Sequence, residues 1–387
     1  MGESETLKMA QKARELSALG HKVINLSLGE PDFETPKHIR DAAVKALDDG
    51  FTKYTPVPGL QVLRDAIRDK FQRDNHLSFT SNQIVVSNGA KQSLANVMLA
   101  LLEEGDEVIV FTPYWVSYYE MIRLTGAEPI FLSAGINQDF KVTPGQLLAA
   151  LNRRTRMVLF SSPCNPTGAV YSQNELEALA EVLKDHPQII VVSDEIYEYI
   201  NFTGNHFSIG SIPHMQDRTV TVNGFAKGFA MTGWRLGYMG APQWIASACS
   251  KIQGQFTSGA NSFGQVAGAH ALNSSLEATN AMRDQFKKRR DLLANRLSKM
   301  EGWLVNIPEG AFYLFPDIST FFGKTGPDGI IRNADDFTDL LLDHAFVALV
   351  SGGAFGAPKC IRISYAASES DLMEACDRIE NVMLLIK

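Results

Sequence analysis

The segment Ile189-Ile-Val-Val-Ser-Asp194 is the stretch of sequence that decides the fold. Its apolar residues follow one another without polar alternation, which is typical of a strand that is covered on both faces. The strand ends at a carboxylate. Because open α/β sheets bind ligands at the carboxyl ends of their strands, we expect Asp194 to lie at a ligand-binding edge. The alternative is that Asp194 only caps a following helix, since Asp is a preferred N-cap residue.

Short apolar runs of the same kind recur along the chain. They alternate with helical stretches or long loops, and this alternation predicts an α/β domain with a mostly parallel sheet flanked by helices. The predicted strands are 84–87, 107–111, 157–160, 189–193, 220–223 and 236–239, with a further strand at 23–28.

The pattern changes after about residue 275. A long charged helix is predicted over 276–300, followed by short strands at 312–315, 346–350 and 361–364 and by a final helix from Ser368. We therefore expect a second, smaller α+β domain. A chain of 387 residues is too long for one compact core. We assign residues 31–275 to a large domain, and residues 1–30 with 276–387 to a small domain built from both chain ends.

Composition excludes several classes of function. The net charge of −7 gives no electrostatic footprint for nucleic acid. The longest apolar runs have the length of strands and cannot span a bilayer, and charged residues in the first 20 positions argue against a signal peptide. The four cysteines are far apart without a C-x-x-C pair, so we expect neither a metal cluster nor disulfides. A cytoplasmic location fits best.

Two glycine-containing loops carry cations near predicted strand ends. Gly89, Ala90 and Lys91 follow one strand and open a helix, where backbone N–H groups bind anions. Lys91 is electrostatically misplaced in a first helical turn unless it extends into water or meets an anionic ligand. Lys227 lies among small residues, eight positions before Arg235. A desolvated lysine beside other cations forms Schiff bases, and arginine grips phosphate with paired hydrogen bonds; the alternative is a surface lysine on a glycine-rich loop.

Three other polar or aromatic residues have competing interpretations. Asn165 either belongs to a plain turn or points its side chain into the same sheet edge as Asp194. Arg362 interrupts an apolar strand and is either an exposed strand residue or a clamp for a carboxylate. Trp115 is either a core residue or a stacking platform for a planar ring.

Taken in order, these places and their surroundings form one pattern over nearly the whole chain. The segments are Ser27-Leu-Gly29-Glu-Pro-Asp-Phe33, Lys53-Tyr54-Thr-Pro-Val-Pro-Gly59, Asn88-Gly-Ala-Lys91-Gln92, Pro113-Tyr-Trp115-Val-Ser-Tyr118, Ser162-Pro-Cys-Asn165-Pro-Thr-Gly168, Val192-Ser-Asp194-Glu-Ile-Tyr197, Ala226-Lys227, Thr232-Gly-Trp-Arg235, Gly310-Ala-Phe-Tyr313 and Ile361-Arg-Ile-Ser-Tyr365. The pattern resembles the class I aminotransferases, which are fold type I enzymes dependent on pyridoxal 5′-phosphate (PLP). Within them it is most similar to the prokaryotic-type aspartate aminotransferases.

The resemblance implies a role for each matching residue. Lys227 forms the internal aldimine and shuttles the proton in a ping-pong transamination, and Asp194 pairs with the pyridine nitrogen. The remaining cofactor contacts are Tyr197 and Asn165 to the phenolic oxygen, Trp115 on the ring, and Gly89, Ala90, Lys91 and Arg235 on the phosphate. Arg362 binds the substrate α-carboxylate, with Asn165, Gly29 and Trp115 beside it. Tyr54 reaches the phosphate of a neighbouring subunit, which implies a homodimer.

The resemblance is firmer on the reaction than on the substrate. Lys91, with Thr6, matches the residues that read a distal carboxylate, so the expected substrates are L-aspartate or L-glutamate with 2-oxoglutarate or oxaloacetate. Prephenate or aromatic transamination and a PLP-dependent β-lyase or decarboxylase remain alternatives, whereas a DNA-binding regulator of the same fold is disfavoured. Ala226 departs from the serine of many relatives, and we expect a modestly weaker hold on the cofactor phosphate.

Overall fold

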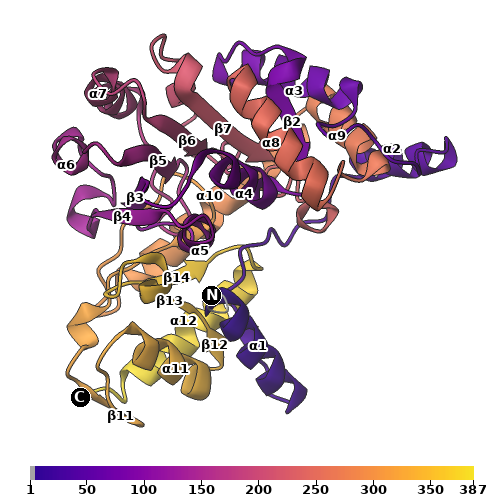
Figure 1. Cartoon of the computed structure of the whole chain (residues 1–387). Helices are drawn as coiled ribbons and strands as arrows, with labels where there is room; N and C mark the ends of the chain where they lie inside the picture. The colour runs from indigo at the N-terminus through magenta and orange to yellow at the C-terminus, as the bar shows by residue number, and fades with distance from the viewer. Residues whose placement is uncertain (1–4) are drawn as a thin grey trace.

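A seven-stranded sheet forms the centre of the larger part of the molecule (Figure 1). The computed structural model describes residues 5–387, and side chains from residue 8 onward. The strand order is β2-β8-β7-β6-β5-β3-β4, in which only β8 runs antiparallel to its neighbours. These strands are β2 (Ile84–Ser87), β3 (Glu107–Thr112), β4 (Glu128–Ser133), β5 (Thr155–Ser161), β6 (Ile190–Asp194), β7 (Thr219–Gly224) and β8 (Gly237–Gly240).

Helices cover both faces of this sheet. Successive side chains of a strand point to opposite faces, so Val108 and Val110 pack under α4, α5 and α8 while Ile109 and Phe111 pack under α6 and α7. Around β2 and β8 the second face is covered by α2, α3 and α9. The helices are α2 (Lys37–Asp48), α3 (Gln61–Asn75), α4 (Ala90–Leu101), α5 (Ser117–Arg123), α6 (Pro144–Ala150), α7 (Gln173–Lys184), α8 (Gln243–Phe256) and α9 (Ser262–Asn273). The expectation of a mostly parallel, doubly covered sheet is confirmed.

The rest of the molecule combines both ends of the chain. In Figure 1 the indigo helix α1 lies against the orange and yellow C-terminal elements, and strand β1 pairs in parallel with β12 through Ile24 and Val347. A small antiparallel sheet has the order β13-β14-β9. The elements are α1 (Glu5–Ala18), β1 (Ile24–Asn25), α10 (Glu277–Leu297), β9 (Tyr313–Leu314), β10 (Thr325–Gly326), β11 (Gly329–Ile330), α11 (Ala334–Ala345), β12 (Val347–Ala348), β13 (Val350–Ser351), β14 (Ile361–Ser364) and α12 (Glu369–Met383).

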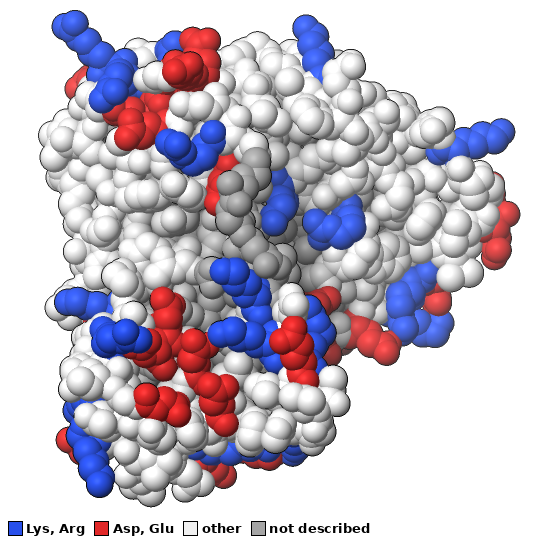
Figure 2. All heavy atoms as spheres, turned by 60° about the horizontal axis from the view of Figure 1, so that its bottom comes forward, with Lys and Arg blue, Asp and Glu red and all other residues white. Residues whose placement is uncertain are grey.

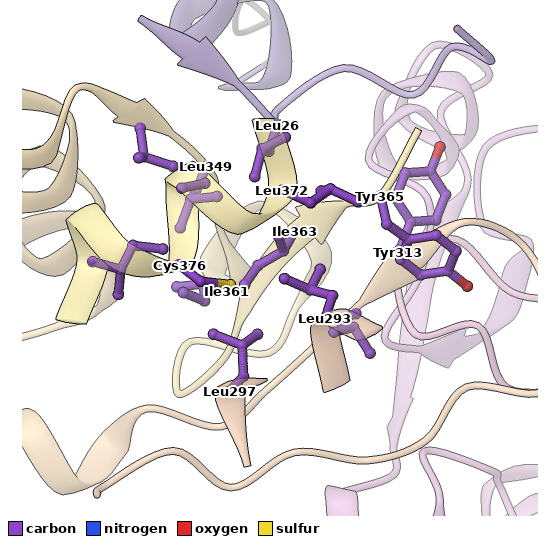
Figure 3. Packing of buried hydrophobic residues seen from close by; sticks show 14 of the residues in the cluster. Leu26, Leu293, Leu297, Tyr313, Leu349, Ile361, Ile363, Tyr365, Leu372 and Cys376 are labelled. Atoms are coloured by element: carbon purple, nitrogen blue, oxygen red, sulfur yellow. The ribbon is translucent and has the colours of Figure 1, made fainter. Parts of the chain in front are cut away.

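One apolar core holds these distant segments together. Figure 3 shows side chains from the N-terminal segment, α10, β14 and α12 pointing into the same space. Examples are Leu26, Leu293, Ile363 and Leu372, each of which is at most 1% exposed. The N-terminal segment therefore packs with sequence that follows the large sheet. The exact division into two domains stays a prediction.

Several predicted strands differ from the structure. The strand expected at 23–28 is reduced to the two residues of β1, because only Ile24 and Asn25 have a partner strand. The strand expected at 346–350 is divided into β12 and β13, and that at 312–315 is reduced to β9. Strand β4 was not predicted: it is an edge strand and lacks the continuous apolar run of the central strands. Within residues 5–387, no helix has the length and apolar character needed to cross a membrane.

Candidate active site

A cavity of about 430 Å³ lies where the carboxyl ends of the large sheet meet the smaller part of the molecule. It collects nearly all of the residues singled out from the sequence. Those that line it are Gly29, Gly89, Ala90, Lys91, Trp115, Asn165, Asp194, Tyr197, Lys227, Arg235 and Arg362. In Figure 2, Lys and Arg side chains stand on several sides of a hollow between the upper, larger part and the lower, smaller part. Such a hollow favours anionic ligands.

Lys227 reaches into this cavity from the turn that follows β7. Its ammonium group donates a hydrogen bond to the carbonyl oxygen of Gly29 and lies 5.6 Å from the centre of the Tyr197 ring. Burial lowers the pKa of Lys227 to about 8, and the nearby cations Arg362 and Arg235 act in the same direction. A lysine with this pKa supplies neutral amine near physiological pH, which is the form that attacks carbonyl groups. The alternative of a surface lysine is therefore wrong.

Asp194 ends β6 and is 5% exposed. One carboxylate oxygen accepts a 2.7 Å hydrogen bond from the hydroxyl of Tyr118, and the other accepts a 3.3 Å bond from the backbone N–H of Ile196. Burial raises the pKa of Asp194 to about 6 despite these two donors. The segment after Asp194 forms turns and no helix, so the N-cap alternative is wrong. An apposed cation would stabilise the ionised carboxylate.

Tyr118 was not among the predicted site residues. It lies on α5, is 1% exposed, and packs edge-on against Trp115 with ring centres 5.6 Å apart. Trp115 lies two residues before α5 begins, and the backbone N–H of Tyr118 donates a 2.9 Å hydrogen bond to the Trp115 carbonyl, so a turn brings the two side chains together. The spacing of three residues was the available signal, but the contact with Asp194 spans 76 residues of sequence and leaves no local pattern.

Arg362 is a buried cation at the wall contributed by the smaller part. It is 2% exposed, donates 3.0 Å to the side-chain oxygen of Asn165 and 2.6 Å to the carbonyl of Ser27. Its Nε atom has no hydrogen-bond partner among the described residues. The exposed-strand alternative is thus wrong. A buried guanidinium held only by neutral oxygens is suited to an incoming carboxylate, which would supply the missing charge.

Tyr197 completes the wall between Lys227 and Arg362. Its hydroxyl lies 2.7 Å from that of Tyr313, a buried residue that the sequence analysis quoted but gave no role. The Tyr313 ring stacks against the Arg362 guanidinium at 4.6 Å. Burial raises the pKa of Tyr197 well above its usual value, so its hydroxyl keeps its proton and can donate it in a hydrogen bond.

The opposite end of the cavity is built to hold an anion. Helix α4 begins at Ala90 with no side-chain cap, so the N–H groups of Ala90 and Lys91 are available to a ligand. Gly89 has a φ of 84°, and a Cβ there would lie 2.4 Å from the Arg235 guanidinium. Glycine is therefore required where the loop and Arg235 converge.

Lys91 and Trp115 border the same end. The Lys91 ammonium group lies 4.9 Å from the centre of the Trp115 ring, within cation–π range. Burial lowers the pKa of Lys91, and the Arg235 charge lowers it further. Trp115 packs against the core below α4 and α5 and also faces the cavity, and its role as a stacking platform stays a prediction.

Tyr54 is the predicted site residue that does not line the cavity among the described side chains. Tyr54 is 100% exposed in the single chain. The side chain of Thr6 lies outside the described residues.

Comparison with known proteins gives the family. The family model described as "Aminotransferase class I and II" matches residues 21–379. The chain belongs to the class I and II aminotransferases. It is 47% identical, over 99% of its length and 81% of the relative's, to a bifunctional aspartate aminotransferase and glutamate/aspartate-prephenate aminotransferase of Petunia hybrida. It is 46% identical to an aspartate/prephenate aminotransferase of Cereibacter sphaeroides, covering 97% of this chain and 95% of that one.

A solved structure supports the same family assignment. The aspartate aminotransferase of Rhizobium meliloti superposes with a TM-score of 0.97 at 42% identity, covering 100% of this aminotransferase and 98% of the other chain. The fold type I architecture expected from the sequence is confirmed.

Proposed function

We propose that this aminotransferase is a PLP-dependent aspartate aminotransferase, which exchanges the amino group between L-aspartate or L-glutamate and oxaloacetate or 2-oxoglutarate. The observation that carries the proposal is the arrangement of charges around Lys227. An anion cradle at Gly89 and Arg235, a buried carboxylate at Asp194 and a buried, incompletely paired guanidinium at Arg362 all face the cavity that holds this amine.

The residues present fit PLP. The phosphate matches the Arg235 guanidinium and the N–H groups of Ala90 and Lys91 at the start of α4, next to Gly89. Burial without a cationic partner raises the pKa of Asp194 to about 6. A protonated ring nitrogen beside Asp194 would supply the missing positive charge. The Trp115 ring supplies a stacking face, and Asn165 and Tyr197 supply polar groups for the phenolic oxygen. When bound, PLP withdraws electrons from the substrate α-carbon.

Each remaining step belongs to side chains of the protein. Arg362 binds the substrate α-carboxylate through two parallel N–H groups, which orients the α-hydrogen. Lys227 Nζ, with its lowered pKa, accepts the α-proton of the amino acid in the first half-reaction. In the second half-reaction it returns a proton to the α-carbon derived from the 2-oxo acid. Asp194 stays ionised beside the ring nitrogen and keeps a proton there, while Tyr118 holds the carboxylate in place.

Lys91 supports an acidic substrate. It lies at the cavity wall beside Trp115, where a second carboxylate of aspartate or glutamate relieves its repulsion by Arg235. Thr6 is proposed to assist it. Prephenate is the second candidate, because relatives that match nearly the whole chain carry prephenate in their names. Aromatic substrates and β-lyase chemistry are less favoured, since neither uses a cation at this wall.

A homodimer in the cytoplasm is the proposed active form. Tyr54 is fully exposed in the single chain, and Phe256 is 69% exposed. Large exposed aromatic side chains are commonly buried in an interface between subunits. We propose that Tyr54 then contacts the phosphate in the partner's cavity.

The test is an absorbance spectrum of the PLP-loaded protein between about 300 and 500 nm, roughly the range in which the lysine-bound cofactor absorbs. L-aspartate should convert the visible band to the near-ultraviolet band of the aminated cofactor, and oxaloacetate should appear in equal amount. A visible band that is lost on adding glutamate but not aspartate, and that prephenate then restores, would select the second candidate. Pyruvate with ammonia would indicate a β-lyase. Absence of any band would refute the role of Lys227.

A further inference from the structure

A second group of charged side chains is buried on the other side of the turn that follows β6. Asp194 and Tyr197 line the cavity, whereas Glu195 and Glu198 turn away from it toward α3 and the loop at His206. The two sets alternate along one short turn. Whatever fixes Glu195 and Glu198 therefore also fixes the two cavity residues.

Glu195 is held by donors on both of its oxygens. One oxygen accepts a 2.9 Å hydrogen bond from the Ser193 hydroxyl. The other lies 2.7 Å from Nε2 of His206 and accepts bonds of 2.5 Å from Ser208 and 3.2 Å from the Asn75 amide. These donors occupy lone pairs on both oxygens of the carboxylate.

The charges of this cluster balance only if His206 is protonated. Lys70 forms an ion pair with Glu198, and the two side chains are 0% and 3% exposed. Asn75 joins them, accepting 2.5 Å from Lys70 and donating 2.8 Å to Glu198. Glu195 is left with one cationic partner, the imidazole of His206, whose side chain is 10% exposed. An unpaired buried carboxylate is costly, which favours the imidazolium.

The surroundings of the ring agree with this state. Burial lowers the pKa of His206, and the charge of Lys70 lowers it further. Glu195 and Glu198 together raise this pKa by more than those two effects lower it, so it lies above the usual value. Tyr199, Tyr238 and Asp74 are the other titratable groups facing this cluster. The phenols are neutral, because burial raises their pKa well above the usual value.

A metal site is a weaker interpretation of the same residues. Ligand atoms of Glu195, Glu198 and His206 lie within 4.8 Å of one another. However, the ammonium group of Lys70 already contacts Glu198 and supplies the positive charge there. A metal ion would have to displace it.

We propose that His206 is a positioning residue for transamination: as an imidazolium paired with Glu195, it locks the turn that carries Asp194 and Tyr197 and cancels the negative charge next to Asp194. The inference rests on the proposed function, in which Asp194 keeps a proton on the cofactor ring nitrogen. Loss of the imidazolium leaves one uncompensated charge beside Asp194. That charge raises the proton affinity of the cofactor-binding groups.

The experiment is a pH titration of the visible absorbance band of the PLP-loaded protein without substrate. His206→Gln keeps a donor for Glu195 but removes the charge, and should move the midpoint up by about 0.5–1 pH unit. The double variant His206→Gln with Glu195→Gln removes both charges and should return the midpoint to within about 0.2 unit of the wild type. His214→Gln is the matched control, because the hydrogen bond that His214 makes among the described residues goes to a backbone carbonyl, that of Ala180, and not to a carboxylate.

A merely structural role predicts no such rescue by the second substitution. A midpoint that is the same in the wild type and in His206→Gln would overturn the inference while leaving the proposed function intact. Absence of the band from the wild type would overturn the proposed function and the inference with it.

If His206→Gln does not fold, the protonation of His206 can be measured in the wild type. The rate of hydrogen–deuterium exchange at the imidazole C2 position is followed against pH, and mass spectrometry of peptides assigns it to His206. A half-point for His206 above the ordinary value of about 6.5 is expected, and one below it overturns the inference.

Discussion

Lys70 and Lys227 are both shielded from bulk water, yet the protein treats them in opposite ways. Lys70 meets the carboxylate of Glu198 and the amide oxygen of Asn75, so its charge is fully paired. Lys227 meets a backbone carbonyl and has two arginines nearby, and its pKa falls to about 8. The comparison shows that pairing, more than burial, separates a lysine that stabilises a fold from one that carries chemistry.

The largest expected effect is the loss of turnover in Lys227→Ala. Nucleophile and proton carrier are removed together, so the rate of transamination should fall by at least about 10⁴-fold. Circular dichroism should show an unchanged fold, because Lys227 makes no ion pair among the described residues. Steady-state transamination by this variant at a rate near that of the wild type would show that Lys227 does not carry the chemistry.

Lys70→Met should have the opposite profile. Breaking a buried ion pair leaves Glu198 uncompensated and should lower the free energy of unfolding by about 3–5 kcal/mol, measured by urea denaturation. The PLP absorbance band should survive at low temperature. Lys251→Met, at an exposed position of α8, serves as the matched control. Equal stability of the two variants would mean that Lys70 is not structural.

Arg362→Lys tests whether the guanidinium is more than a charge. Lysine keeps the charge but cannot form two parallel hydrogen bonds, so kcat/KM for aspartate should fall by about 10²-fold. The absorbance band of the cofactor should be retained, since the hydrogen bonds of Arg362 go to Asn165 and Ser27 and not to Asp194 or Arg235. Loss of the band instead would place Arg362 in cofactor binding.

Asp194→Asn probes the cost of the unpaired carboxyl. Burial raises the pKa of Asp194 from 3.8 to about 6, so the folded state prefers the protonated form. This preference contributes about 2–3 kcal/mol to the free energy of unfolding. The whole contribution is present below about pH 4, and it is lost as the pH rises through about 6. Without PLP, Asp194→Asn should therefore gain stability over the wild type as the pH rises from 4 to 7. A difference that does not change with pH would contradict this.

Tyr118→Phe should give the smallest effect. It removes one charge-assisted hydrogen bond to Asp194, worth about 1.5 kcal/mol, and should weaken PLP binding about tenfold in equilibrium dialysis. Tyr119→Phe, on the same helix but partly exposed, is the control. Equal affinities in the two variants would remove Tyr118 from the site.

The sequence was most informative where a signal is local. The central strands were predicted because each is a continuous apolar run, and β2 has the predicted bounds of residues 84–87. Lys227, Asp194 and Arg362 were found because each is a charged residue within or shortly after a predicted apolar strand. The cavity that joins them depends on chain crossings that no local pattern records.

The site residues that were missed share one property. Tyr118, Tyr313 and the cluster around Glu195 act through partners far away in the sequence: Asn75 reaches Glu195, and Lys70 reaches Glu198, both from α3. A glutamate beside a recognised aspartate looks like an ordinary polar residue until the partner is placed. Edge strand β4 was missed for a different reason, since its exposed positions interrupt the apolar run.

The pairing of β1 with β12 has a consequence for synthesis on the ribosome. Strand β1 precedes the large sheet in the sequence but finds its partner only when Val347 appears, after every strand of that sheet. Strands β2 to β8, with Asp194 and the turn bearing Lys227, are complete long before then, and domains fold as they emerge. The nascent chain thus forms the groups for the cofactor first. Arg362 arrives last, and with it the ability to accept a substrate.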